Sequence, residues 1–184
     1  MIDNVRWQRA NPAFSSFCLE ESPFYWLTRA SGRYLLQMER NLKAIGMDVP
    51  RWRVLMILAE DEPAAVTVLS ERSVVKLATM TRIVQRMVAD GLVATEGSAE
   101  DGRVTQVRMT DAGREALQQV RAEGSRVFIA TFASSPAPEV EALVAQLRHL
   151  FDRLDEMPFP LAKRRIFYSP ASDCAKLAKT SNGL

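Results

Sequence analysis

One short segment of the chain, KLATMTRIVQRMVADGLV at residues 76–93, has the residue types and spacing to bind a polyanion. Its polar side chains recur on one side of a helix, at Thr79, Arg82, Gln85 and Arg86. Arginine, threonine and glutamine donate hydrogen bonds to phosphates and to the edges of bases. The segment is therefore either a solvated surface helix or a helix that reads nucleic acid.

The other side of the same segment predicts burial against a core. Its apolar residues follow one another at three- and four-residue steps, at Leu77, Met80, Ile83, Val84, Met87 and Val88. Gly91 suits the position after a helix end, because glycine enters the left-handed region without a Cβ penalty. A short apolar strand is expected directly afterwards.

The composition allows a nucleic-acid partner but does not by itself indicate one. The chain has 184 residues, 47% of them hydrophobic, and a net charge of +2 at pH 7. A net charge this small requires any DNA-binding charge to be local. The sequence has no run of about 18 apolar residues and no apolar signal segment, so we expect neither a membrane span nor export.

The titratable residues offer little material for catalysis or metal binding. Cys18 and Cys174 lie near opposite ends without metal-ligand spacing, which fits a reducing cytoplasm. The single histidine, His149, falls in a helical pattern. No nucleophile with a base, phosphate loop or metal cluster is recognisable, so we expect neither an enzyme nor a bound cofactor.

The remaining pattern predicts a mainly α-helical chain with one small β-hairpin. The expected helices span about 23–44, 50–60, 68–73, 76–90, 110–132 and 139–156, and the strands span about 92–96 and 103–110. Thr67 is the expected cap of the third helix, and Thr110 or Asp111 that of the fifth. Residues expected to face inward in the fifth helix include Phe128 and Thr131.

From residue 50 to residue 110, the order of elements is that of a winged helix-turn-helix. Such a fold presents its second helix to the major groove, with the N-terminal residues nearest the bases. Lys76 and the residues that follow it would then lie nearest the bases. Arg103 near the hairpin tip would supply charge to a minor groove or the backbone, and Asp101 could hold its guanidinium in one orientation. Arg108 would add charge further along the strand.

Three motifs together give the chain a resemblance to the MarR family of bacterial transcription regulators. They are WRVLMILAE (52–60), LSERSVVKLATMTRIVQRMVADGLV (69–93) and EDGRVTQVRMTDAG (100–113), and the resemblance covers about residues 24–154. It implies a homodimer that binds a near-palindromic double-stranded DNA operator, many such proteins being repressors released by small aromatic acids. The DNA-binding positions it implies are Lys76, Leu77, Ala78, Thr79, Thr81, Arg82 and Arg86, with Asp101 and Arg103 in the wing.

The resemblance also implies a division of the chain by role. Residues 49–110 would form the DNA-binding winged helix-turn-helix, and residues 1–48 and 111–184 a helical dimerisation region. The chain departs from the family at two positions. Val74 stands where the tight turn often has glycine, and Lys76 stands where the recognition helix often begins with serine or aspartate.

A small aromatic carboxylate, phenolic or indolic, is the expected effector. Such a ligand needs an apolar slot and one placed cation. The candidate ligand-binding residues are Trp26, Arg29, Ser31, Tyr34, Trp52 and Arg53, with Arg33 and Arg51 as further cations. The alternative is that the aromatic residues are ordinary core and the arginines are solvated or face DNA.

Two other roles remain open. Cys18 could act as a thiol sensor, although Glu20 and Glu21 beside it would disfavour the thiolate. The winged helix could instead bind a protein. A protein-binding winged helix is expected to lack basic residues on its second helix and wing. This chain has them there, which argues against that role.

Overall fold

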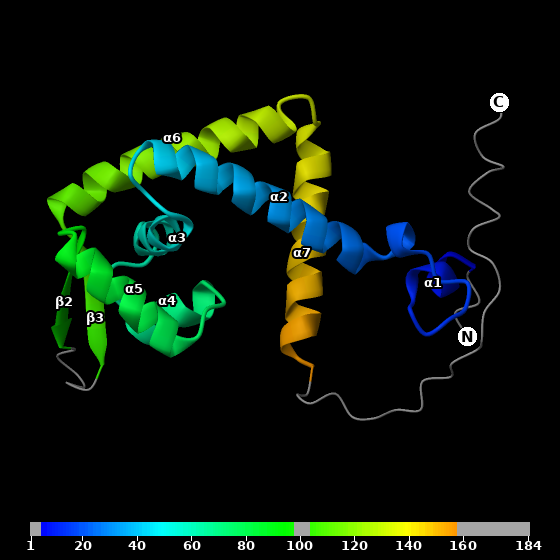
Figure 1. Ribbon diagram of the computed structural model, residues 1–184, viewed down its shortest axis with the longest axis horizontal. Coiled ribbons are helices and arrows are strands. Elements are labelled where there is room, and N and C mark those ends of the chain that lie inside the picture. Colours follow the sequence, from blue (N-terminus) through cyan, green and yellow to red (C-terminus); the bar gives the residue numbers. More distant parts are fainter. Residues whose placement is uncertain (1–4, 98–103, 158–184) are drawn as a thin grey trace. The chain divides into compact units, whose positions relative to one another are not determined.

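The computed structural model describes residues 5–97 and 104–157, which are mainly helical with one small antiparallel sheet (Figure 1). The helices are α1 (Val5–Ala10), the 3-10 helix η1 (Leu19–Glu21), α2 (Pro23–Ala44), α3 (Val49–Leu58), α4 (Val66–Arg72), α5 (Leu77–Ala89), α6 (Asp111–Phe132) and α7 (Ala137–Asp155). The strands are β1 (Ala64–Ala65), β2 (Val93–Gly97) and β3 (Thr105–Met109). The predicted fold class is confirmed. The expected hairpin tip and the tail fall mostly outside the described residues.

The chain forms two compact units, residues 34–134 and residues 1–33 with 135–184, and α2 runs through both. The first unit holds one apolar core, around which α3, α4, α5 and the β2–β3 hairpin gather in Figure 1. The largest fully buried side chains are Met38, Leu42, Leu55, Leu58, Leu69, Met80, Met87, Val54, Val107 and Val120. These residues come from α2 to α6, so the helix that carries the candidate site is anchored in the same core as the hairpin.

The sheet has the strand order β1-β3-β2, and both pairings are antiparallel. Val107 in the central strand pairs with Ala64 on one side and Thr95 on the other, and it is fully buried. The sequence analysis did not predict β1, because two consecutive alanines show no alternation of apolar and polar residues.

Glu62 links the segment before β1 to β3 and α6 through hydrogen bonds. Its carboxylate accepts a hydrogen bond from the backbone N–H of Met109 at 2.8 Å and bonds from the Arg114 guanidinium at 2.9 and 3.1 Å. Burial acts to raise the pKa of Glu62, but these donors outweigh it and hold the pKa below its usual range. The charged form of Glu62 therefore stabilises the native chain, and that contribution is lost as the pH falls through the lowered pKa.

Side chains at the helix ends explain where several elements begin. Thr110 accepts a backbone N–H from the first turn of α6 at 3.1 Å, which confirms this residue as the cap. Asp48 caps α3 in the same way at 2.8 Å. The predicted cap at Thr67 is wrong. The chain passes directly from β1 into α4, so the helix begins at Val66 with Ala65 in the N-cap position and no side-chain cap.

In the other unit, the N-terminal arm folds back on itself. The backbone N–H of Cys18 donates to the carbonyl of Arg9 at 2.7 Å, and the Arg9 guanidinium pairs with Glu21 at 2.7 Å. The ring nitrogen of Trp26 donates to the carbonyl of Glu20 at 2.7 Å. These bonds fix the arm against the start of α2.

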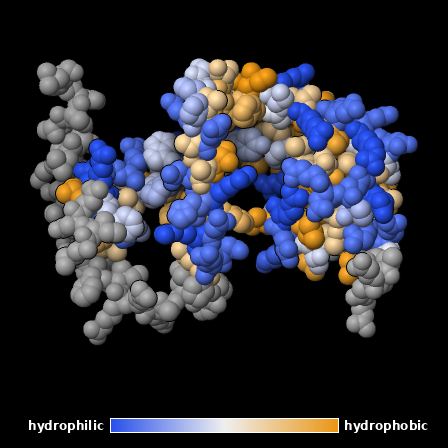
Figure 2. Space-filling model, turned by 180° about the vertical axis from the view of Figure 1, so that it is seen from behind, coloured by the Kyte–Doolittle hydropathy of each residue, from blue (hydrophilic) through white to orange (hydrophobic). Residues whose placement is uncertain are grey.

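The apolar stripes of the long helices are buried along only part of their length. In α2 the buried residues are Met38 and Leu42, both in its C-terminal half. The prediction that Phe128 and Thr131 face inward is wrong, since Phe128 is 55% exposed and Thr131 is also exposed. Helix α7 has no buried residue at all. Hydrophobic residues consequently lie on the surface among hydrophilic ones, as the face drawn in Figure 2 shows.

Candidate nucleic-acid interface

A tight turn between α4 and α5 sets the start of the candidate recognition helix. The carbonyl of Ser70 accepts the Val75 N–H at 3.0 Å, and the Ser70 hydroxyl donates to the Val75 carbonyl at 2.6 Å. Between them, Val74 has φ of 52° and is 76% exposed. A β-branched residue rarely adopts this left-handed conformation. The departure from the family at Val74 therefore falls on a position where glycine would be less strained.

The inner face of α5 holds the helix on the core. Its buried residues are Met80, Ile83, Val84 and Met87. At the C-terminal end, Gly91 turns the chain with φ of 71°, and Asp90 forms an ion pair with Arg51 of α3. Arg51 is thus already paired, which makes it a weaker candidate for a ligand carboxylate than the sequence suggested.

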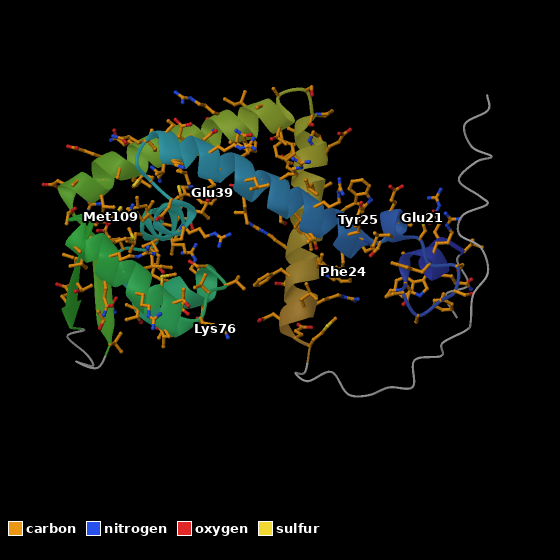
Figure 3. The ribbon with its side chains drawn as sticks, in the orientation of Figure 1. Glu21, Phe24, Tyr25, Glu39, Lys76 and Met109 are labelled. Atoms are coloured by element: carbon orange, nitrogen blue, oxygen red, sulfur yellow. The ribbon has the colours of Figure 1, made fainter. Side chains whose placement is uncertain are left out.

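The outer face of α5 presents cations with no acidic partner among the described residues. Lys76, the N-cap residue, marks the N-terminal end of α5 in Figure 3. Arg82 and Arg86 follow on the exposed side of the helix. None of the three forms an ion pair within the described part of the chain. The sequence places no acid between Lys76 and Asp90. Such a face suits a polyanion, because it carries positive charge without a competing internal partner.

The exposed surface of α5 divides into two strips at helical spacing. The cationic strip contains Thr79, Arg82 and Arg86, which line a shallow depression with Ala89. The wing-side strip contains Leu77, Thr81 and Val88, which line a groove of about 500 Å³ between α5, α4 and the hairpin. Ala78 is also exposed. Leu77 and Val88 were expected in the buried stripe, but they are 49% and 40% exposed and line the groove instead.

The hairpin contributes less charge than the sequence suggests. The Arg108 guanidinium donates to the Glu96 carboxylate at 2.6 Å across β2 and β3, and both side chains are about half exposed. Arg108 is therefore not the free cation that we expected on the wing. Asp101 and Arg103 lie outside the described residues, so their role remains a prediction.

The candidate ligand residues fall into two separate clusters. In residues 34–134, Tyr34 and Trp52 stack edge to face with ring centroids 6.0 Å apart. Burial raises the pKa of the Tyr34 hydroxyl, and the positive charge of Arg53 opposes this shift. Arg53 and Trp52 are half-buried, so this cluster combines an aromatic wall with a cation.

The second cluster lies at the start of α2, in the other unit. The Arg29 guanidinium lies 5.2 Å from the Tyr25 ring centre and 5.9 Å from that of Trp26, and it donates to the Tyr25 hydroxyl at 3.0 Å. Tyr25 marks this end of α2 in Figure 3. Ser31, two residues after Arg29 in α2, is exposed. Arg29 already has aromatic partners, whereas Arg53 forms no ion pair within the described ranges.

The environment of Cys18 differs from the one expected. Of the two acids beside it in sequence, Glu21 is paired with Arg9. The pKa of Arg9 is raised first by the hydrogen bond to Glu21 and its charge, with a smaller contribution from Cys18. Cys18 is half-buried and not in a disulfide. Residues 5–97 and 104–157 contain no metal-binding group of histidine, cysteine or carboxylate side chains and no helix able to span a membrane.

Comparisons with known proteins agree with this arrangement. The model of the MarR family matches residues 45–104. The chain is 43% identical over 147 residues to the HTH-type transcriptional repressor IacR of Pseudomonas putida, with 80% of this chain and 88% of that protein covered. A MarR-family regulator from Silicibacter pomeroyi shares 26% identity at a TM-score of 0.67, with 74% of this chain and 92% of that one covered.

A further solved structure has a known small-molecule regulator. BpsR of Bordetella bronchiseptica, whose DNA binding is regulated by 6-hydroxynicotinic acid, has the same fold at 21% identity and a TM-score of 0.63. The alignment covers 70% of this chain and 98% of that one. With the extensive identity to IacR and the family match from α3 to β2, the chain belongs to the MarR family of transcription regulators.

Proposed function

We propose that the protein is a homodimeric, sequence-specific DNA-binding repressor that a small aromatic carboxylate releases from its operator. The observation that carries this proposal is the outer face of α5, where Lys76, Arg82 and Arg86 are exposed and form no ion pair with any residue that the structure describes. In this role, Ala78 allows close approach to the duplex, Thr79 bonds a base or a phosphate, and the arginines neutralise phosphates. The relationship to a transcriptional repressor supports repression rather than activation as the mode of regulation.

The exposed apolar face of α7 supports the homodimer. Its large residues, each between 42% and 56% exposed, recur at helical spacing at Leu143, Val144, Leu147, Phe151 and Leu154. A soluble protein rarely leaves such a continuous stripe in water. A second copy with the same stripe would cover it, because a two-fold axis brings identical patches together. A dimer would also present two recognition helices to the two halves of a near-palindromic operator.

The cluster of Tyr34, Trp52 and Arg53 supports an aromatic carboxylate as effector. Two rings inclined at 69° offer an apolar wall to a planar ligand. The Arg53 guanidinium, which forms no ion pair with a described residue, offers a charge-assisted bond to the ligand carboxylate. Regulation of BpsR by 6-hydroxynicotinic acid shows that a protein of this fold responds to a ligand of this class.

A binding experiment with one control acid tests the effector. DNA selected by the protein from a random library serves as the probe, and 6-hydroxynicotinate, hydroxybenzoates and an indole carboxylate serve as ligands. Cyclohexanecarboxylate controls for charge without an aromatic ring. We expect an effective acid at 100 times its Kd to stabilise the protein by about 2.7 kcal/mol and to weaken DNA binding.

Two variants locate the site within the same assay. Arg53→Gln should raise the Kd of the acid about tenfold or more, as expected for loss of a charged hydrogen bond. Arg40→Gln, an exposed arginine of α2, is the matched control and should leave the Kd unchanged. If no aromatic acid acts while peroxide abolishes DNA binding and Cys18→Ser restores it, thiol sensing replaces the ligand mechanism.

A further inference from the structure

The wing-side strip of α5 has a chemistry that phosphate binding does not explain. Leu77 in the first turn is 49% exposed, and Val88 is 40% exposed. The groove that they line contains only aliphatic residues, threonines and a glutamine among its described residues. This side of the helix therefore offers apolar contacts, while the opposite strip carries Arg82 and Arg86.

Thr81 adds to the apolar character of the strip. Its hydroxyl donates to the carbonyl of Leu77 at 3.0 Å, within the helix itself. This bond occupies the hydroxyl proton, so Thr81 has no free donor for a base edge in this conformation. Its methyl group remains available for contact one turn behind Leu77.

One group in the major groove of DNA matches an apolar strip at the front of a recognition helix. Thymine alone presents a methyl group there, and the N-terminal residues of such a helix lie nearest the bases. The cationic strip on the other side of α5 complements the phosphates. We propose that Leu77, with Thr81 behind it, contacts the C5-methyl group of a thymine in each half-site and makes that base pair part of the specificity.

This inference rests on the proposed DNA binding, and replacing thymine by uracil tests it separately. Uracil keeps every hydrogen-bonding group and lacks only the methyl. The probe is the DNA selected from a random library, with each thymine replaced in turn by uracil. For the wild-type protein we expect one thymine in each half-site at which the replacement weakens binding about fourfold, the value for one buried methyl group.

The Leu77→Ala variant identifies the protein side of the contact. It should bind the thymine probe at least as weakly as the wild type binds a probe with uracil at the sensitive position of both half-sites, and it should no longer distinguish thymine from uracil there. Val88→Ala, on the same strip but three turns further along, is the control and should retain the distinction. A thermal melt of each variant shows whether the fold is intact, and Leu77→Gln, of similar length but polar, serves if Leu77→Ala unfolds.

The outcomes separate the two proposals. Equal wild-type affinity for all thymine and uracil probes overturns the methyl contact and leaves DNA binding intact. A methyl effect that persists in folded Leu77→Ala overturns the assignment to Leu77. If the library yields no preferred sequence and binding is independent of salt, DNA binding fails together with this inference.

Discussion

Helices α5 and α7 carry apolar stripes of the same period, but the described part of the chain buries only that of α5. The stripe of α5 meets the core, where Met80 and Met87 are almost completely buried. The stripe of α7 leaves Leu147 and its neighbours more than two-fifths exposed. The period of the apolar residues shows that a helix will bury one face. It does not show whether the atoms that cover this face come from the same chain, and in this respect the proposed DNA-binding helix α5 differs from the proposed dimer helix α7.

The largest expected effect comes from charging the stripe of α7. Leu147→Glu should raise the dimer dissociation constant by at least about a hundredfold, because each of two leucines loses about 1.5–3 kcal/mol of burial. Sedimentation or light scattering across a concentration series measures this. Gln146→Glu adds the same charge on the polar face and should leave the dimer intact. A wild-type protein that is monomeric at all concentrations would contradict the proposed role of α7.

The next effect separates the two faces of α5. Met87→Ala should destabilise the protein by about 2–5 kcal/mol, since its side chain is completely buried. Val88→Ala, one residue later and partly exposed, should change stability by less than about 1 kcal/mol. Urea unfolding of the two variants gives the comparison. An equal loss of stability in both variants would mean that α5 is rotated about its axis, so that Val88 is as buried as Met87.

A smaller effect concerns the reading of bases. Thr79→Val removes an exposed hydroxyl while keeping the shape of the side chain, and it should reduce discrimination between selected and random DNA by about 1–3 kcal/mol. Thr81→Val should reduce it less, because that hydroxyl already bonds to the helix. Competition binding measures both ratios. An equal loss of affinity for selected and random DNA would assign Thr79 to a phosphate instead.

The smallest effect should be a gain in stability. Val74→Gly relieves a left-handed β-branched residue, and we expect about 1 kcal/mol of stabilisation after the entropy cost of glycine is subtracted. Val75→Gly, at a partly buried neighbour that packs on the core, should destabilise instead. Urea unfolding distinguishes the two. Destabilisation by Val74→Gly would show that the turn does not hold this residue at positive φ.

Local signals in the sequence identified most of the fold. Thr110, Pro23 and Gly91 mark helix ends by chemistry that acts within a few residues, and the structure places the ends there. Two-residue β1 was missed because it exists only through its pairing with β3. The false cap at Thr67 has the same origin, since β1 leads directly into α4.

The candidate site was harder to predict from the sequence, because whether an arginine is free or paired depends on acids that are distant in the chain. The pairing of Arg51 with Asp90 has no local signal. The pairing of Arg108 with Glu96 could have been inferred from the hairpin register, in which Arg108 faces Ala94, one diagonal step from Glu96. Lys76, Arg82 and Arg86 form no ion pair within residues 5–97 and 104–157, so the predicted positive face of α5 keeps its charge there.

The most direct measurement of DNA binding through α5 is the salt dependence of the Kd for selected DNA. With about six to ten phosphate contacts, the logarithm of the affinity should fall with the logarithm of salt at a slope of roughly −5 to −9. Arg82→Ala/Arg86→Ala removes two arginines from each protomer, so the folded double variant should have a slope shallower by about four, while Arg121→Ala on the exposed surface of α6 should keep the wild-type slope. A flat wild-type curve, or an unchanged slope in the folded double variant, would contradict DNA binding by this face.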